Sequence, residues 1–157
     1  MGLVGCASVS PDGGFGVVAQ QAGGHLDATL SYQRTLQDTD AARERTAQLL
    51  AQPLSAATAV QIALLGNREL QAGYGQLGLA EAERVRAATL PNPLLSLGRL
   101  AGGGVVEIDR ALSLDVLGLF TLPLARQRGE RQLRQAQWQA AIDTIATAAA
   151  ARKAFYG

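Results

Sequence analysis

Residues 91–123 read PNPLLSLGRLAGGGVVEIDRALSLDVLGLFTLP, and this stretch decides the fold. Within it, apolar residues alternate with other residues in two runs, 94–100 and 106–115. A glycine-rich segment, residues 101–104, separates the two runs. Alternation at a period of two on both sides of a glycine-rich connection predicts a β-hairpin.

Helices are predicted on both sides of this hairpin. A helix rich in alanine and glycine is expected over residues 55–89, with Ser55 as its N-cap and a weak point at Gly66-Asn67. A second such helix is expected from Pro123 to the end of the chain, because proline is favoured in the first helical turn. The predicted fold class is therefore mainly α with a β-hairpin. The helix–strand junctions are assigned to Pro91, Asn92, Pro93 and Pro123.

The second apolar run has two different faces. Its even-numbered positions are apolar except for Arg110, and its odd-numbered positions are acidic or small. Ten residues at ~3.3 Å each give a strand of about 33 Å, and a tilt near 45° reduces its height to roughly 23 Å, close to the ~25 Å apolar band of an outer-membrane barrel. We therefore predict two transmembrane β-barrel strands. The membrane-facing residues are Val106, Ile108, Leu112 and Leu114, and the lumen-facing residues are Glu107, Asp109, Ser113 and Asp115.

Two arginines leave an alternative open. Arg99 falls on the apolar parity of the first run, and Arg110 lies on the apolar face of the second. Because an arginine on the lipid face costs ~2–4 kcal/mol at mid-membrane, both are expected near a membrane interface. A soluble amphipathic hairpin packed on the helices explains the same alternation. Since an isolated hairpin is marginally stable in water, it needs partners in either case.

Composition narrows the possible functions. Charged residues make up 17% of the 157 residues, and aromatic residues only 4%, so the alanine-rich helices suit close helix–helix packing. A net charge of +1 gives no argument for nucleic-acid binding. One histidine and one cysteine leave little room for a metal site, a catalytic triad or an internal disulfide. The sequence therefore predicts neither an enzyme nor a cofactor. No apolar run is long enough for a transmembrane helix, so contact with a membrane would be made by strands.

The N-terminal region contains one short motif. Leu3-Val4-Gly5-Cys6 resembles the lipobox of bacterial lipoproteins, which makes Cys6 the predicted lipid attachment site. Such a motif normally follows a charged segment and an apolar stretch, and neither precedes it here. Residues 7–30 are expected to be a flexible linker. A short helix is expected over residues 38–51, with Asp38 or Asp40 as its N-cap.

Both long helices carry a predicted core stripe and a predicted solvated face. In the first helix a seam of 3.5-residue period, typical of a coiled coil, comprises Val60, Ala63, Asn67, Leu70, Tyr74 and Leu77. Its charged cluster, expected in solvent, comprises Glu81, Glu83, Arg84 and Arg86. Four arginines near the start of the second helix oppose the helix dipole and indicate a solvated or interface-proximal face: Arg126, Arg128, Arg131 and Arg134. The expected core stripe of that helix contains Trp138 as a packing anchor, Ala141 or Ile142, Ile145, Ala148 or Ala149, and Arg152.

From Pro53 onward, several short motifs occur together. They are Pro53-Leu54-Ser55, ALLGN at residues 63–67, LGLAEA at residues 77–82, LPNP at residues 90–93, and the arginine-rich start of the second helix. In this order the chain resembles the outer-membrane efflux proteins of the TolC-like family, of the lipoprotein type. Arg68 departs from the pattern, because the family often has proline there. The resemblance divides the chain into an N-terminal lipoprotein-like linker, residues 1–52, and a first helix–hairpin–helix repeat, residues 53–157, truncated at its C-terminus.

The resemblance implies a trimeric duct. In the family, strands from three protomers close one barrel in the cell outer membrane, and long antiparallel helices continue it as an α-barrel through the periplasm. The chain would be the outer-membrane channel component of a tripartite efflux system, a homotrimer when full length, anchored by a lipid such as palmitate. A periplasmic adaptor (membrane fusion) protein and an inner-membrane pump would be its partners, with drug or metal cargo left open. The alternative is a soluble helical scaffold or interaction module whose hairpin is not in a membrane.

Overall fold

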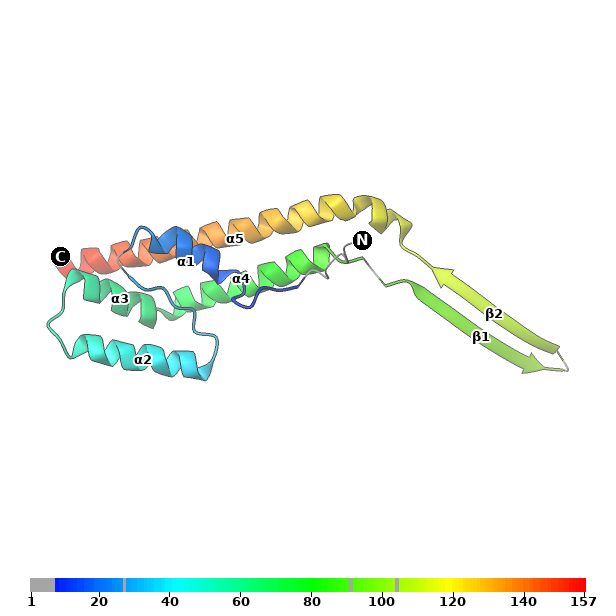
Figure 1. Ribbon diagram of the computed structural model, residues 1–157, viewed down its shortest axis with the longest axis horizontal. Helices are drawn as coiled ribbons and strands as arrows, with labels where there is room; N and C mark the ends of the chain where they lie inside the picture. Colours follow the sequence, from blue (N-terminus) through cyan, green and yellow to red (C-terminus); the bar gives the residue numbers. More distant parts are fainter. Residues whose placement is uncertain (1–7, 27, 91, 104) are drawn as a thin grey trace, which may run out of the picture.

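The computed structural model describes residues 8–26, 28–90, 92–103 and 105–157; the side chains of residues 100–102, 105 and 107 lie outside the description. Cys6 and Pro91 therefore fall outside the described residues. Within these residues, five helices and two strands form an elongated molecule (Figure 1). In chain order they are α1 (Phe15–Gly23), α2 (Leu36–Leu50), α3 (Ala56–Gly66), α4 (Arg68–Ala87), β1 (Leu94–Gly102), β2 (Val105–Ser113) and α5 (Val116–Tyr156).

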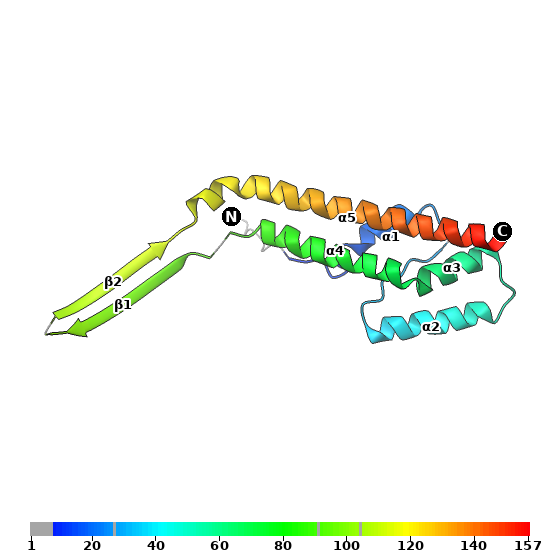
Figure 2. The same cartoon turned by 180° about the vertical axis from the view of Figure 1, so that it is seen from behind.

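The helices form a bundle, and the hairpin projects beyond one end of it (Figure 1 and Figure 2). Helix α5 runs antiparallel to α3 and α4 and contacts both, while α1 packs on α5 and α2 on α3. Strands β1 and β2 form a two-stranded antiparallel sheet. The predicted class, mainly helical with a β-hairpin, is confirmed.

Asn67 divides the first predicted helix in two. Its backbone, at φ −76° and ψ 105°, is extended, so α3 ends before it and α4 begins after it. Its side-chain oxygen accepts a hydrogen bond from the backbone N–H of Leu70 and so caps α4. Ser55 caps α3 in the same way through Thr58. The expected N-cap and the expected weak point are both confirmed.

The start of α5 differs from the prediction. The helix begins at Val116, and Pro123 lies inside it rather than in its first turn. The Asp115 carboxylate accepts a hydrogen bond from the backbone N–H of Gly118 at 2.8 Å, which satisfies a free donor of the first turn. Asp115 is therefore the helix cap and not a strand residue. Inside a helix, proline removes one backbone hydrogen bond and its ring crowds the carbonyl four residues earlier, so Pro123 lowers the stability of the start of α5.

The N-terminal region is more ordered in secondary structure than expected. The predicted linker contains α1, whose Val18 and Ala22 are fully buried against the bundle. Helix α2 is capped by Thr35, with Asp38 as the reciprocal partner of a capping box, so neither Asp38 nor Asp40 is the N-cap. A threonine hydroxyl that reaches the third helical residue explains the earlier start.

The core lies where α4, α5, α1 and α3 meet. Phe15, Tyr32 and Tyr74 form an aromatic cluster with ring centroids 4.8 to 6.0 Å apart, although the chain has few aromatic residues. Four of the six predicted seam residues are buried, namely Val60, Leu70, Tyr74 and Leu77. The seam prediction therefore holds for its large side chains.

The buried face of α5 matches the predicted stripe only in part: Ala141 and Ala148 are buried, but the large side chains of the stripe are not. Trp138 and Ile142 are each 56% exposed, whereas Ala140, Ala141 and Thr144 are buried. Small residues face the bundle because the helices approach closely, and a tryptophan does not fit there. In an alanine-rich helix the apolar period alone does not fix which face is inward. Trp138 is therefore not a packing anchor in this chain.

Candidate functional site

The hairpin is the part of the molecule that the helices leave uncovered. β1 and β2 pair antiparallel over nine residues each, from the base at Leu94 to the tip at Gly102. Gly103, the first residue of the connection, has a φ of 61°, which glycine adopts without steric cost. The connection predicted over residues 101–104 is shorter in the structure, because two-residue connections are favoured in hairpins and the last residues of β1 join the ladder.

The register places most predicted membrane-facing residues on one face. Leu95 pairs with Leu112, and Arg99 pairs with Ile108, so odd positions of β1 share a face with even positions of β2. We call this the apolar face of the hairpin. Its large side chains are 52–71% exposed: Leu95, Leu97, Val106, Ile108 and Leu112. Leu114 is also exposed, but it lies beyond the end of β2.

Those predicted lumen-facing residues that belong to β2 lie on the opposite face of the hairpin. Asp109 is opposite Gly98, and Ser113 is opposite Leu94. Glu107 has the same parity, but its side chain lies outside the described part. Asp115, as the cap of α5, is not on either face. At Asp109, Ala111 and Ser113 the opposite face is acidic or small, but Leu94 of β1, which is 66% exposed, lies on it as well.

Two arginines interrupt the apolar face at mid-strand. Arg99 and Arg110 are each the sixth residue of a nine-residue strand. The register places them on successive rungs of the same face, opposite Ile108 and Leu97, so they are diagonal neighbours. Neither makes an ion pair with a described residue. The middle of the hairpin therefore carries two positive charges on its otherwise apolar side.

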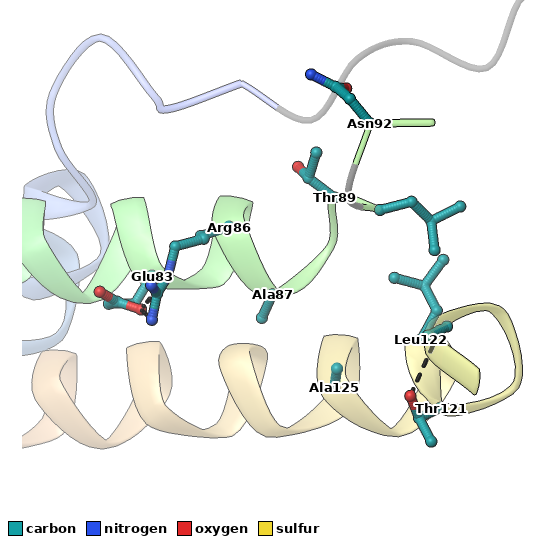
Figure 3. A pocket seen from close by; sticks show the side chains of 10 residues that line it. Glu83, Arg86, Ala87, Thr89, Asn92, Thr121, Leu122 and Ala125 are labelled. Carbon is teal, nitrogen blue, oxygen red and sulfur yellow. Dashed lines mark hydrogen bonds and ion pairs between the residues drawn. The ribbon is translucent and has the colours of Figure 1, made fainter. Parts of the chain in front are cut away.

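A groove opens where the hairpin meets the helices (Figure 3). It has a volume of about 590 Å³ and lies between the end of α4 and the first turns of α5. Its only charged lining residues in the described part of the chain, Glu83 and Arg86, are joined by a hydrogen bond of 3.0 Å. Asn92, a predicted junction residue, also lines it, and the remaining described lining is apolar, glycine or threonine.

The segment before α1 is held at the same end of the bundle. The Glu81 carboxylate accepts hydrogen bonds from the backbone N–H of Ser10 at 3.0 Å and from its hydroxyl at 2.9 Å. The Arg84 guanidinium donates to the carbonyl oxygen of Ser8 at 3.2 Å. Glu81 is only 4% exposed, so its predicted place on a solvated face is wrong. No sequence pattern identified this contact, because its partners are 71 residues apart.

The predicted junction prolines differ in their positions. Pro93 is exposed in the link between α4 and β1, immediately before the strand, as expected. Pro123 lies inside α5.

Residues of the predicted solvated faces are otherwise mostly exposed, including Arg126, which donates to the carbonyl oxygen of Ala88 and so caps the end of α4.

Other kinds of site are not found in the described part of the chain. No group of three or more histidine, cysteine, aspartate or glutamate residues is arranged to hold a metal ion among the residues that the structure describes. No described helix combines the length and the hydropathy needed to cross a membrane.

Comparisons with models of protein families, with curated proteins and with solved structures gave no match to this chain. The hairpin, its two faces and its attachment to the bundle are therefore the basis for a functional proposal.

Proposed function

We propose that the chain is part of an outer-membrane duct, the passive channel component of a tripartite efflux system. The observation that carries the proposal is the uncovered hairpin, with five large apolar side chains on one face, and on the other Asp109, Ala111 and Ser113 of β2 together with the exposed Leu94 at its base. In water such a face is unfavourable, because each exposed apolar side chain forgoes burial worth ~1.5–3 kcal/mol. In a bilayer the same face is solvated by lipid.

The dimensions of the hairpin support this proposal. Nine residues at ~3.3 Å give about 30 Å of strand, and a 45° tilt gives a height of roughly 21 Å. Transmembrane β-strands have about 9–11 residues, so this hairpin is near the short end of the range. Both of its outer edges need partner strands, because backbone donors and acceptors must be satisfied in lipid. A trimer of full-length protomers would supply those strands.

The attachment of the N-terminal segment also supports the proposal. Ser8 is bound by Arg84, in the last turn of α4 and therefore next to the hairpin. Cys6 is two residues earlier, and two extended residues reach at most about 7 Å. A lipid on Cys6 would then anchor the chain at the hairpin end of the bundle. The helices would extend from there into the periplasm, toward the adaptor protein and the pump.

A second candidate is a soluble helical scaffold whose hairpin binds another protein. Arg99 and Arg110 favour it, because two arginines facing lipid at mid-height would together cost about 4–8 kcal/mol. On this reading, a partner would cover the apolar face and pair the arginines with carboxylates. Whether the face lies in lipid or against protein discriminates the two candidates.

The duct proposal is tested by two variants of the full assembly in outer membranes. Ile108→Arg should reduce the amount of assembled trimer, because it adds a third charge to the apolar face. Asp109→Asn should leave assembly intact and alter the ion selectivity of single channels, because it removes a charge from the lumen. If both variants assembled and conducted like the parent, the assignment of the faces would be wrong.

A further inference from the structure

The first turns of α5 carry large apolar side chains that the bundle does not cover. Phe120 is 81% exposed and Leu117 is 72% exposed. Leu124 and Val116 are at least half exposed as well. A concentration of exposed apolar side chains of this kind marks a surface that binds a partner or a membrane.

The opposite side of the same turns faces α4. Leu122 and Ala125 line the groove toward α4, and Gly129 lies against the backbone of α4, where an added Cβ would come within 3.0 Å of the Arg84 Cα. The exposed residues are therefore not an inward face left open by the bundle. They form a separate, outward face.

This outward face continues into arginines. Leu117, Phe120, Leu124, Arg128 and Arg131 follow one another at spacings of three and four residues, which places them along one side of the helix. Both arginines are exposed, and neither forms an ion pair or a side-chain hydrogen bond with a described residue. The exposed apolar side chains at the start of α5 are thus followed, on the same side of the helix, by two exposed arginines.

We propose that this face of α5 is an interfacial anchor for an anionic lipid leaflet. The side chains of Val116, Leu117, Phe120 and Leu124 would lie at the boundary between acyl chains and headgroups, and Arg128 and Arg131 would bind headgroup phosphates. The rise from Leu124 to Arg128 is ~6 Å, and to Arg131 ~10 Å. With α5 oriented along the bilayer normal, these rises place Arg128 within the headgroup layer and Arg131 at its outer side, because that layer is ~5–8 Å thick on each side of the hydrocarbon core.

The combination of apolar side chains and arginines on this face of α5 favours a membrane over other binding partners. A planar guanidinium binds phosphate oxygens through two hydrogen bonds, and an anionic leaflet offers many such phosphates next to apolar chains. A neutral apolar partner would leave Arg128 and Arg131 without a counter-charge. The anchor acts through α5 and does not require the hairpin to cross the membrane, so it goes beyond the proposed duct.

The depth of the first turns of α5 in the bilayer is tested with a fluorescent reporter in the full chain. Trp138 is the chain's single tryptophan. A variant that combines Trp138→Phe with Phe120→Trp moves this fluorophore to the apolar turn. Vesicles of phosphatidylethanolamine and phosphatidylglycerol should then shift its emission to the blue, and brominated acyl chains should quench it.

The parent is the matched control for this reporter variant, because Trp138 is ~27 Å further along α5 and should remain unquenched. If the emission of the reporter variant neither shifted with the anionic vesicles nor was quenched by brominated acyl chains, the proposal would be overturned.

Charge is tested by co-sedimentation with the same vesicles. Replacing Arg128 and Arg131 together by glutamine should weaken binding to anionic vesicles by roughly 10- to 30-fold, and should abolish the preference over phosphatidylcholine vesicles. Arg152→Gln with Lys153→Gln, at the other end of α5, is the control and should bind like the parent. Equal binding by the two double variants would overturn the role of the arginines.

Two further readouts separate this proposal from others. When Ile108→Arg is added to the reporter variant, brominated lipid should still quench the fluorescence, so loss of hairpin insertion and loss of the α5 anchor are distinguishable. If Phe120→Ser instead reduced the mass of a self-associated species and left vesicle binding unchanged, a second copy of the chain would cover this face. That result would also overturn the proposal. Circular dichroism and thermal melting verify that each variant is folded.

Discussion

The hydroxyl oxygens of Tyr74 and Thr144 lie 2.7 Å apart in the core and join α4 to α5. Thr144 donates its proton to the carbonyl oxygen of Ala140 at 2.7 Å, so Tyr74 is the donor to Thr144. Both side chains are at most 1% exposed. This polar contact fixes the pairing of the two helices that carry the hairpin.

Tyr74→Phe should lower the free energy of unfolding by about 1 kcal/mol, because one net hydrogen bond is lost while Thr144 keeps its bond to Ala140. Thermal or urea unfolding of parent and variant near neutral pH measures the change. Thr144→Ser keeps the hydroxyl bonded to Tyr74 but removes a buried methyl group, so its own loss of stability measures packing without the hydrogen bond. A Tyr74→Phe protein as stable as the parent would contradict the role of this bond.

The same residue should give the stability a pH dependence. Burial raises the pKa of Tyr74, and the nearby Asp143 charge adds to this, against an opposing effect of the Thr144 hydrogen bond that is smaller than that of burial. The unfolded chain ionises this tyrosine near pH ~10. The stabilisation is therefore complete below that pH and is lost as the pH rises through the higher folded-state pKa. The stability difference between parent and Tyr74→Phe should shrink above pH ~10, and a constant difference would contradict this account.

Gly129 and Gly73 should respond in opposite ways to alanine. An added Cβ at Gly129 would lie 3.0 Å from the Arg84 Cα and 3.2 Å from the Ala87 Cβ, so the helices must separate. At Gly73 nothing lies within 4 Å. Gly73→Ala should raise the free energy of unfolding by about 0.5–1 kcal/mol through helix propensity, whereas Gly129→Ala should lower it by about 1 kcal/mol. Equal stabilisation by both changes would contradict the close approach of α4 and α5.

Glu81→Ala should release the N-terminal segment. The change removes the acceptor of both Ser10 hydrogen bonds and should cost about 1–3 kcal/mol. Limited proteolysis should then cleave near Ser10 sooner than in the parent. Glu83→Ala is the control, because among the described residues Glu83 pairs only with the exposed Arg86, and its loss should change stability by less than about 0.5 kcal/mol. Unchanged proteolysis of the Glu81 variant would show that the contact does not hold the segment.

Asp115 distinguishes a helix cap from a lumen-facing strand residue. Asp115→Asn should preserve stability, because asparagine caps helices about as well as aspartate, while Asp115→Ala should cost about 1 kcal/mol. Unfolding of the two variants measures the difference. A loss of the same size in both would mean that the charge, rather than the cap, is the stabilising feature.

The features that were predictable from the sequence depend on short-range patterns. Alternation on both sides of a glycine-rich segment located the hairpin, and Ser55 and Gly66-Asn67 located one helix start and one break. The features that were missed depend on which residues meet in three dimensions. The contact of Thr144 with Tyr74, the contact between Ser10 and Glu81, and the packing of Phe15 against Tyr74 all join distant residues.

One missed feature did have a local signal. Asp115 precedes an apolar run, as helix N-caps often do, but the strand parity of residues 106–115 and the proline at 123 favoured a later helix start. The exposed Phe120 and its neighbours were therefore not recognised as a helical face. Exposure of Trp138 was equally hidden, because alanine-rich helices satisfy an apolar period on several faces.

The most direct test of the central claim is the water accessibility of the two faces of β2 in the assembled protein. Ile108, Asp109, Leu112 and Ser113 are each replaced by cysteine, and outer-membrane vesicles are treated with a water-soluble maleimide before and after detergent denaturation. The parent, whose single cysteine is Cys6, gives the background. The duct account predicts labelling at 109 and 113 before denaturation, and at 108 and 112 only after it. Equal labelling of all four positions before denaturation would show that the apolar face of the hairpin is not in lipid.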